Sequence, residues 1–447
     1  MLTLDQLSKT FQVENLKSLP VKGVSIDSRS VETGDLFFAL SGPRFDGHNF
    51  VDQALTRGAI AAVVSQDMAN SQHCIKVPCV NWALKQMAQY TRKQFQGRMW
   101  AITGSCGKTS TRHMTAHILQ TVDSAVFQTQ GNLNNHFGVP LMLSRMCQPY
   151  RYAVFECGAS GPDEIAPLAN LIQPEVAAIT NVFNAHIAGF GSIATTARTK
   201  GQIFESLPKH GLAVMPHVSP FKQLWQSQAH AAHILTFGLT KGADVFADQI
   251  TYNTQATTAR LHTPLGTCSL VLPIPGEAML SNALAAIAMV LQEFKDVQSI
   301  ANAFVNYRPA SQRLCFRPGF HHGLTVIDDC YNANPASFSA AVDVLAMQSG
   351  TKFAVVGDMA ELGVESAQAH KALGELLHQS GVEKLWAYGA ESKHVVNAFG
   401  INGQWFDSLQ TMKVAVKQDL SELENAVVLV KGSRAAQLEQ VVSDIIA

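Results

Sequence analysis

The sequence predicts an α/β protein of three domains, and three observations support this fold class. The chain has 447 residues, which is long for a single hydrophobic core. Apolar residues make up 47% of the chain and charged residues only 15%, as in compact proteins with large buried sheets. Short apolar runs alternate with helical stretches, and this alternation is typical of parallel sheets with crossover helices.

Composition also excludes several classes of protein. With 33 basic and 34 acidic side chains the formal charge is −1, so no overall positive field would attract nucleic acid or a membrane surface. The N-terminus lacks the features of a signal peptide, and no apolar run approaches the roughly 20 residues of a membrane-spanning helix. The eight cysteines form no CxxC pair. We expect a reduced, cytoplasmic monomer that neither binds nucleic acid nor inserts into a membrane.

The first part of the chain, about residues 1–80, is predicted to be a small α/β domain. An amphipathic helix is expected near the N-terminus, and residues 21–40 carry short apolar runs separated by glycine and aspartate turn signals. Residues 50–58 then predict a helix that ends at Gly58, and residues 59–64 predict a buried strand.

The second part, about residues 81–308, predicts a larger sheet. It opens with a helical stretch and a strand at 99–103. Later buried strands are expected at 152–157, 176–182 and 212–216. From 244 to 272 polar and apolar residues alternate, as they do in antiparallel strands with one face in water. We therefore expect a mostly parallel sheet with a small antiparallel extension.

A glycine-rich turn joins the strand at 99–103 to the next helix. Its sequence, TGSCGKTS, combines turn glycines, a lysine at the helix start and a hydroxyl after it, which are the parts of a phosphate-binding P-loop. The longer standard motif has glycine where this chain has Ile102, so an ordinary strand-to-helix turn is the alternative. The residues expected to hold a nucleotide are Gly104, Ser105, Cys106, Gly107, Lys108, Thr109 and Ser110.

Three further residues of the second part are candidates for a site beside this loop. Glu156 ends the strand at 152–157, and P-loop enzymes place a Mg²⁺ ligand at the tip of the strand next to the loop. A solvated turn residue would also suit that position. His186 follows another buried strand and Lys200 lies on a predicted helix. Pattern alone assigns neither, because a loop histidine often only makes hydrogen bonds and a helix lysine often only faces water.

The third part, about residues 309–447, predicts a parallel, Rossmann-like sheet. Four apolar strands alternate with helices that begin near Ser337, Ser366, Ser392 and Ser408. Each strand runs into polar or glycine residues, and ligands of open α/β sheets bind beyond the carboxyl ends of the strands. Asp329 is a candidate for ribose hydroxyls, with an Asx-type turn as the alternative. The final KGSR segment is a candidate anion site, with a surface cap as its alternative.

Taken in order, these segments resemble the Mur ligase family across nearly the whole chain. The short phosphate loop is similar to the TGxxGKTT loop of that family, which accounts for the missing glycine. The other matching segments are SIDSRSVETGDLFFAL and DGHNF in the first part, GNLNNHFGVPL, ECGASGPDEI and ARTKGQIFESL in the second, and IDDCYNANPASF, VVGDMAELG and VLVKGSR in the third.

The resemblance implies a role for each matching residue. Lys108 and the loop backbone would hold the phosphates of ATP, and Lys200 matches a lysine that is carbamylated in this family. The ligands of two Mg²⁺ ions would be Thr109, Glu156, His186 and the carbamylated Lys200, with Lys108, His186 and Lys200 as the catalytic residues. Asn282 would lie on the adenine side, Arg313 near the nucleotide and Asp329 at the ribose.

Substrate contacts follow from the same resemblance. The residues that would face a UDP group are Ser28, Arg29, Asp46, Gly47 and His48. Asn134 and Asn135 would lie along the path of a muramyl peptide, and Asn332 and Asn334 near an incoming dipeptide, together with the loop at 357–363. The first domain would therefore recognise the UDP-sugar, the middle one would bind ATP, and the third would bind the dipeptide and close on ATP.

The implied activity is ATP-dependent amide formation in peptidoglycan precursor synthesis. The third-part segments are most similar to the family member that adds D-alanyl-D-alanine to UDP-N-acetylmuramoyl-tripeptide through an acyl phosphate. The DNPR-type segment of the related ligase for diaminopimelate or lysine is absent. A folylpolyglutamate-synthase-like ligase and a catalytically silent nucleotide-binding relative are the alternatives. The first-part segments argue against the former, and the joint presence of Lys108, Glu156, His186 and Lys200 argues against the latter.

The chain departs from the family pattern at several positions. Cys106 and Ser110 stand where asparagine and threonine are usual, and His136 stands where an acid is common. Ala278 and Met279 replace the usual histidine–asparagine pair before Asn282. We expect methionine packing to replace polar recognition at the adenine.

Overall fold

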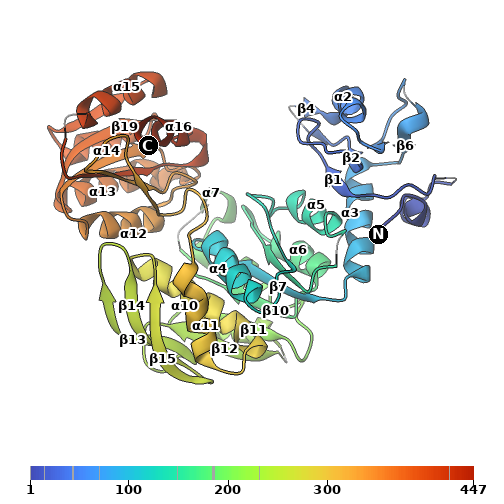
Figure 1. Cartoon of the computed structure of the whole chain (residues 1–447), viewed down its shortest axis with the longest axis horizontal. Coiled ribbons are helices and arrows are strands. Elements are labelled where there is room, and N and C mark those ends of the chain that lie inside the picture. Colours follow the sequence, from blue (N-terminus) through green and yellow to red (C-terminus); the bar gives the residue numbers. More distant parts are fainter. Residues whose placement is uncertain are drawn as a thin grey trace.

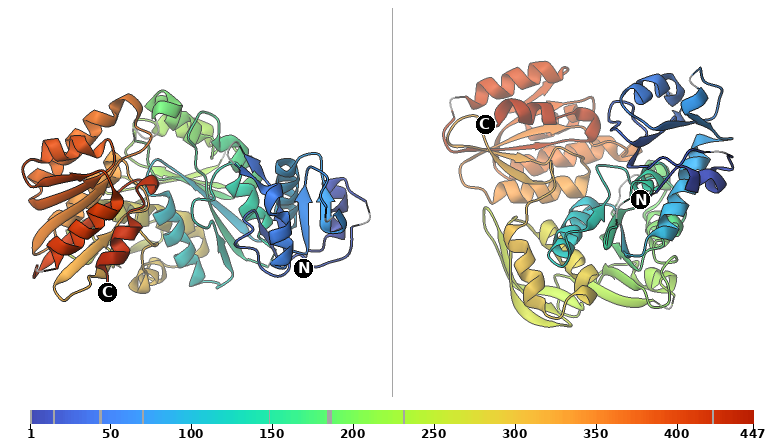
Figure 2. Two further views of the ribbon diagram at one scale, coloured as in Figure 1. Left: turned by 90° about the horizontal axis from the view of Figure 1, so that it is seen from above. Right: turned by 45° about the vertical axis from the view of Figure 1, so that its right-hand side comes forward.

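The computed structural model describes residues 2–14, 16–42, 45–69, 71–147, 149–183, 187–230, 232–421 and 423–447. Three bodies of helices and strands follow one another along the chain (Figure 1), and the first and last lie on opposite sides of the central one. Seen from above, the central body lies between the other two, and in the view turned by 45° the first and last bodies both lie above it (Figure 2). Among the described residues, no helix is both long enough and apolar enough to cross a bilayer.

The N-terminal body is built on a four-stranded parallel sheet. Its order is β1 (Gly23–Ser25), β2 (Asp35–Phe38), β5 (Ala61–Val64) and β6 (Cys74–Lys76), with α2 (Val51–Thr56) before β5 and a small pair of strands, β3 (Ser41–Gly42) and β4 (Phe45–Asp46), beside it. The expected N-terminal helix is short. It consists of a 3₁₀ turn (Asp5–Leu7) and α1 (Ser8–Phe11), and it ends where Gln12 takes a left-handed conformation with φ 57°.

A single long helix, α3 (Val80–Gln94), carries the chain into the central body. Its buried face, with Val80, Ala83, Leu84 and Met87, belongs to the core of the N-terminal body. The same helix packs against α5 (Gly138–Ser144) of the central body. The two bodies are therefore joined by side-chain packing as well as by the chain.

The central body contains a nine-stranded sheet. The strands are β7 (Arg98–Thr103), β8 (Val126–Gln128), β9 (Tyr152–Glu156), β10 (Val176–Ile179), β11 (Leu212–Pro216), β12 (His233–Gly238), β13 (Val245–Tyr252), β14 (Thr257–Thr263) and β15 (Gly266–Leu272), in the order β15-β14-β13-β12-β11-β10-β7-β9-β8. Only the last three strands pair antiparallel. The predicted parallel sheet with an antiparallel extension is confirmed, although β8 and β12 were not predicted.

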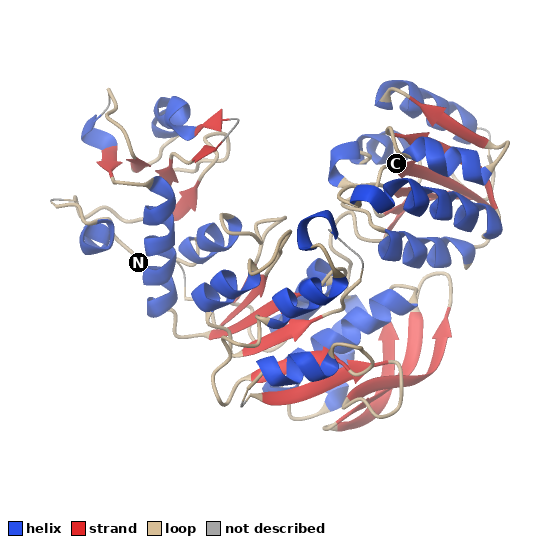
Figure 3. Ribbon diagram, turned by 180° about the vertical axis from the view of Figure 1, so that it is seen from behind, coloured by secondary structure: helices blue, strands red, loops and turns tan. Residues whose placement is uncertain are grey.

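Helices cover both faces of this sheet (Figure 3). On one face lie α4 (Lys108–Gln120), α10 (Glu277–Val290) and α11 (Val297–Ala303). The helices of the other side are α5, α6 (Ile165–Ile172), α8 (Ile193–Gly201) and α9 (Lys222–Gln228), with α7 (Ile187–Phe190) before α8. Each face has its own hydrophobic core, so the strands are apolar on both sides and read as continuous apolar runs.

The C-terminal body has a six-stranded sheet in the order β16-β17-β21-β18-β19-β20. The strands are β16 (Cys315–Pro318), β17 (Leu324–Asp328), β18 (Thr351–Gly357), β19 (Val382–Tyr388), β20 (Gly403–Phe406) and β21 (Ala426–Lys431), and the helices are α12 (Pro335–Ala346), α13 (Ser366–Gln379), α14 (Ser392–Phe399), α15 (Leu409–Leu420) and α16 (Glu439–Ile445). The four predicted strands are parallel, and only β16 at the edge runs antiparallel.

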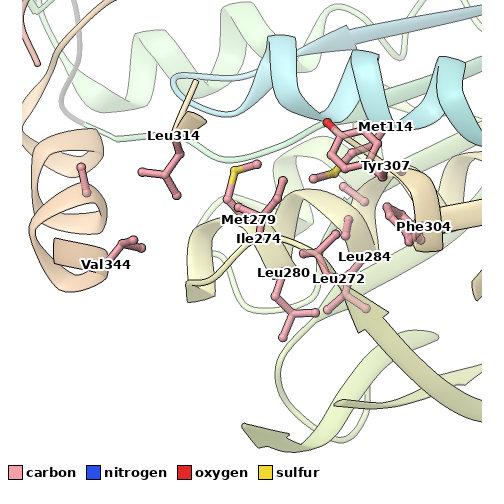
Figure 4. Packing of buried hydrophobic residues seen from close by; sticks show 14 of the residues in the cluster. Met114, Leu272, Ile274, Met279, Leu280, Leu284, Phe304, Tyr307, Leu314 and Val344 are labelled. Carbon is pink, nitrogen blue, oxygen red and sulfur yellow. The ribbon is translucent and has the colours of Figure 1, made fainter. Parts of the chain in front are cut away.

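The C-terminal body rests on the central one through α12. Val344 of α12 lies near Leu314 and Met279 in one continuous hydrophobic cluster (Figure 4). Gln348, just beyond α12, donates from Nε2 to the carbonyl oxygen of Thr254, 3.1 Å away, in the turn between β13 and β14. One side of α12 therefore packs against the central body along the length of the helix.

Candidate nucleotide and catalytic site

The glycine-rich loop between β7 and α4 is held tightly against its neighbours. Gly104 and Gly107 have φ angles of 152° and 78°, a region that favours glycine. A Cβ atom at Gly104 would overlap Thr180 Oγ1, and one at Gly107 would overlap Asn282 Oδ1. Both glycines are therefore required by close approach as well as by backbone conformation.

Hydrogen bonds from the end of β10 fix the same loop. The backbone N–H groups of Ser105 and Cys106 donate to Asn181, at the carbonyl oxygen (3.0 Å) and at Oδ1 (2.8 Å). Lys108 Nζ folds back onto the carbonyl oxygen of Gly104, 2.8 Å away. The first amides of α4 still point out of the helix N-terminus, where an anion is stabilised by N–H groups and the helix dipole. Asn181 is a positioning residue to which the sequence analysis gave no role.

Glu156, at the end of β9, is the centre of the site. It is 2% exposed. Its Oε2 accepts a hydrogen bond from Thr109 Oγ1 (3.0 Å), and its Oε1 accepts one from Asn134 Nδ2 (2.9 Å). The structure thus brings Thr109, Glu156 and Asn134 together from three separate segments of the chain.

Arg112 is a member of this cluster that the sequence analysis missed. It lies four residues after Lys108 on α4, which places both side chains on the same face of the helix. Arg112 is 6% exposed, and its Nε lies 3.6 Å from Glu156 Oε2. Burial lowers the pKa of the guanidinium, and the Glu156 carboxylate acts in the opposite direction. The four-residue spacing on a helix that begins with the P-loop lysine is the signal that could have found it.

Lys200 is buried on α8, with 2% of the residue exposed. Among the described residues no carboxylate forms an ion pair with it, and its Nζ lies 5.7 Å from the ring centroid of Phe190. Burial first, and then the positive charge of Lys108, lowers the pKa of Lys200 from 10.5 to about 7. A large fraction of this amine is therefore uncharged near neutral pH, unlike a solvated lysine.

The linker into the C-terminal body also reaches the phosphate loop. Arg313 Nη2 donates to Thr109 Oγ1 (3.2 Å), and its guanidinium lies over the ring of Tyr331, 4.2 Å from the centroid. Asn282 lies on α10 behind the loop, where Oδ1 accepts a weak hydrogen bond from Thr111 and Nδ2 faces Met279 Sδ. Met279 is itself only 7% exposed.

The strand ends of the C-terminal sheet come together as expected from parallel strands. Lys431 Nζ lies 2.6 Å from Asp329 Oδ2, and the N–H of Ser433 donates to the carbonyl oxygen of Asp358. Asp329 Oδ1 also accepts from the N–H of Leu314 (3.1 Å), so this acid ties the linker to the sheet. Asp358 accepts hydrogen bonds from the N–H and hydroxyl of Ser392, at the start of α14.

Breaking the buried Lys431–Asp329 pair should destabilise the protein strongly. Lys431→Met would leave the Asp329 carboxylate buried without its cation, at a cost of about 3–5 kcal/mol in the free energy of unfolding. Urea unfolding followed by circular dichroism measures this cost. The control is Lys371→Met, which removes an exposed pair with Glu375 (3.8 Å) and should cost less than about 1 kcal/mol. Equal losses in the two variants would contradict the structural importance of the buried pair.

The candidate UDP residues form a compact group in the N-terminal body. Asp46 Oδ1 accepts from the N–H of His48 and lies 2.6 Å from His48 Nδ1. Ser41 and His48 together lower the pKa of Asp46 to about 2. Gly47 lies against the backbone of Leu40, where a side chain would clash.

Two further candidates in this body differ in exposure. Ser28 is buried and its hydroxyl donates to Gln53 Oε1 (2.7 Å). The Arg29 side chain is 83% exposed and pairs with Asp27. Arg29 is therefore the candidate whose charged group is most accessible to a ligand phosphate.

The remaining candidates have structural partners of their own. Asn135 Oδ1 accepts from the N–H groups of Phe137 and Gly138 before α5. Asn334 caps α12 through Ser337, and the carbonyl oxygen of Asn332 accepts from Lys431 Nζ. His186 lies outside the described residues.

The residues present fit a bound Mg²⁺ ion. Thr109 Oγ1 and Glu156 Oε2 offer a hydroxyl and a carboxylate oxygen 3.0 Å apart at the start of α4. Such hard oxygen ligands, together with phosphate oxygens, are the donor set that Mg²⁺ prefers.

Comparison with known proteins agrees with this geometry. Residues 102–290 match the Mur ligase middle domain, residues 312–434 match the Mur ligase, glutamate ligase domain, and residues 20–94 match the Mur ligase family, catalytic domain. The chain is 37% identical over 442 residues to the UDP-N-acetylmuramoyl-tripeptide–D-alanyl-D-alanine ligase of Escherichia coli, covering 98% of this chain and 97% of that protein. The chain belongs to the Mur ligase family.

Solved structures of Mur ligases show the same fold. The crystal structure of MurF from Acinetobacter baumannii is 33% identical, with a TM-score of 0.88 and coverage of 99% of this chain and 98% of the other. MurF ligase from Thermotoga maritima in complex with ADP is 28% identical, with a TM-score of 0.80 and coverage of 96% and 98%. The three-domain α/β Mur ligase fold predicted from the sequence is confirmed.

Proposed function

We propose that this Mur ligase is an ATP-dependent enzyme that joins D-alanyl-D-alanine to UDP-N-acetylmuramoyl-tripeptide. The products are UDP-N-acetylmuramoyl-pentapeptide, ADP and phosphate. Family membership over nearly the whole chain supports the reaction class. The observation that carries the site assignment is the 3.0 Å contact between Thr109 and Glu156, beside Lys108 at the N-terminus of α4.

The reaction must bring two anions together. A carboxylate oxygen of the tripeptide bonds to the γ-phosphorus of ATP while the bond to the ADP oxygen breaks, which gives an acyl phosphate. The amine of D-alanyl-D-alanine then bonds to the acyl carbon, loses a proton, and phosphate leaves. Lys108 would exchange the Gly104 carbonyl for phosphate oxygens and neutralise charge there. Positioning of the phosphate by the loop backbone supplies much of the remaining rate enhancement.

The metal ligands would be Thr109, Glu156, His186 and a carbamylated Lys200, and we propose two Mg²⁺ ions. When bound, Mg²⁺ supplies charge neutralisation at the phosphate oxygens. Asn134 and Arg112 hold the Glu156 carboxylate in place from two sides. The acyl phosphate reacts with water, so a site that closes and excludes solvent is expected.

The nucleotide and substrates would be shared among the three bodies. Asn282, Arg313 and Asp329 are proposed to contact the nucleotide, with Met279 beside Asn282 packing at the adenine. Residues 1–80 would recognise the UDP-sugar, residues 81–308 would bind ATP, and residues 309–447 would bind the dipeptide. Every proposed residue comes from one chain, so a monomer suffices. All eight cysteines are free thiols, which fits the proposed cytoplasmic location.

The lowered pKa of Lys200 predicts a pH-dependent carbamate. Only the uncharged amine reacts with CO₂, and the folded pKa of about 7 lies below the ordinary value of 10.5. Carbamate at Lys200 should therefore be scarce at pH 6, rise through pH 7 and level off near pH 8. Carbon-13 NMR with labelled bicarbonate measures it, and Lys200→Ala is the control that should lack the signal. A carbamate signal that persists in Lys200→Ala would contradict the assignment.

ADP release tests the proposed reaction. The purified protein should release ADP from ATP and Mg²⁺ only when both the UDP-linked tripeptide and D-alanyl-D-alanine are present. Omission of either substrate should reduce the rate to background. Equal ADP release without the dipeptide would indicate an ATPase and would contradict the ligase. Separate assays with diaminopimelate and lysine tripeptides identify the preferred third residue.

A further inference from the structure

The N-terminal end of α12 touches the phosphate loop directly. Asn334 Nδ2 lies 3.1 Å from Cys106 Sγ, and Asn334 Oδ1 lies 3.3 Å from the same sulfur. The two residues are 228 positions apart and belong to different bodies. Asn334 Oδ1 also accepts from the N–H of Ser337 (2.9 Å) to cap the helix, so Nδ2 is the atom that can donate to the sulfur. Neither the expected role of Cys106 in the phosphate loop nor that of Asn334 near the dipeptide involves this contact.

Residue 106 is well suited to such a contact. Its backbone is fixed on both sides, because its N–H donates to Asn181 Oδ1 and its carbonyl oxygen accepts from the Thr180 hydroxyl. The side chain is therefore presented from a rigid loop. Cysteine is also shorter than the asparagine usual in this loop, which lets the cap of α12 approach closely.

A second contact accompanies the first. Arg313 Nη2 donates to Thr109 Oγ1, and this hydroxyl is the one proposed to bind Mg²⁺. The linker that carries Arg313 lies between two anchors. Tyr307 is held by His113 Nδ1 (3.1 Å) on α4, and Leu314 is held by Asp329 of the C-terminal sheet. The position of the C-terminal body and the state of the Thr109 hydroxyl are therefore linked.

We propose that Cys106 and Asn334 form a latch that holds the C-terminal body in a resting position, which Mg²⁺-nucleotide binding must release. In this position the cationic Arg313 donates a hydrogen bond to the Thr109 hydroxyl. A metal ion cannot bind that oxygen while the guanidinium is there, because the two positive charges repel. A ligand that binds only the released state loses affinity in proportion to the population of the resting state. Asn334 is then a positioning residue and not a contact of the dipeptide. The proposal rests on the proposed function in taking Mg²⁺-nucleotide as the ligand and Thr109 as a ligand of the metal.

A double-mutant cycle on nucleotide affinity tests the latch. Isothermal titration calorimetry of the full chain with Mg²⁺ and a non-hydrolysable ATP analogue gives Kd without turnover or dipeptide. Cys106→Ala removes the sulfur, and Asn334→Ser removes the amide while keeping a good helix cap. Each should bind the analogue about 2- to 10-fold more tightly, because loss of one hydrogen bond that favours the resting position changes the affinity by about this factor. The double variant should bind no more tightly than either single variant, because both remove the same contact.

A control separates the latch from general damage. Asp296→Asn changes the cap of α11, away from the loop, and should leave Kd unchanged. Unchanged or weaker binding in both single variants, or additive effects in the double variant, would overturn the proposal. A wild-type chain that binds no analogue would instead contradict the proposed function.

Discussion

Lys200→Ala is expected to reduce the ligation rate at least about 10³-fold, because it removes the group proposed to become an anionic metal ligand. The native side chain is buried, so its truncation leaves a cavity. Circular dichroism of the variant therefore accompanies the assay as the check on folding. ADP release in the complete reaction measures the loss.

Added short carboxylic acids should partly restore the Lys200→Ala variant. The truncated side chain leaves space in which an acid could supply the missing carboxylate oxygens. Lys209→Ala, at an exposed lysine, is the matched control and should retain full activity without rescue. Wild-type activity in Lys200→Ala would exclude the carbamate role.

Lys108→Met should have an effect of similar size, about 10²–10⁴-fold on kcat/KM, because the methionine keeps the length of the side chain but removes its charge. The cation is needed most when the carboxylate approaches the γ-phosphate. The loss should therefore fall on kcat as well as on the KM for ATP. Steady-state kinetics with varied ATP separates the two.

The control for Lys108→Met is the exposed Lys371→Met, which should leave both parameters unchanged. A change confined to KM, with kcat retained, would indicate that Lys108 binds ATP equally in the ground and transition states. That result would contradict its proposed catalytic role.

The fold was predictable from the sequence where strands are long and buried. Strands such as β7, β9 and β21 are buried on both faces and appear as continuous apolar runs. The missed strands are short or partly exposed. β8 has three residues, and β12 and β20 are only partly buried. Their place in a sheet depends on neighbouring strands rather than on their own sequence.

The site residues were predictable from the sequence where they lie together in one short segment. The glycines, lysine and threonine of the loop lie within six residues, and Glu156 follows from its place at a strand end. Arg112 and Asn181 were not assigned, because their importance depends on contacts with residues distant in the sequence. The Cys106–Asn334 contact joins two bodies and leaves no local signal in either segment.

The proposed latch links the position of the C-terminal body to the catalytic residues of the central one. The C-terminal body lies against the central one through α12, with one end at Gln348 and the other at Asn334. Release of the Asn334 end would free Arg313 from Thr109 while the hydrophobic contacts of Val344 remain. The two bodies would then stay in contact after release, so the C-terminal body could still close on bound ATP.

Mass spectrometry of the reaction product decides whether this protein is the proposed ligase. The protein would be incubated with ATP, Mg²⁺, D-alanyl-D-alanine and each UDP-N-acetylmuramoyl-tripeptide in separate reactions. We expect a UDP-N-acetylmuramoyl-pentapeptide, with one phosphate released for each product molecule, and no such product with Lys200→Ala. The absence of this product with both tripeptides, in a protein shown to bind ATP, would contradict the ligase assignment and favour a nucleotide-binding relative without catalysis.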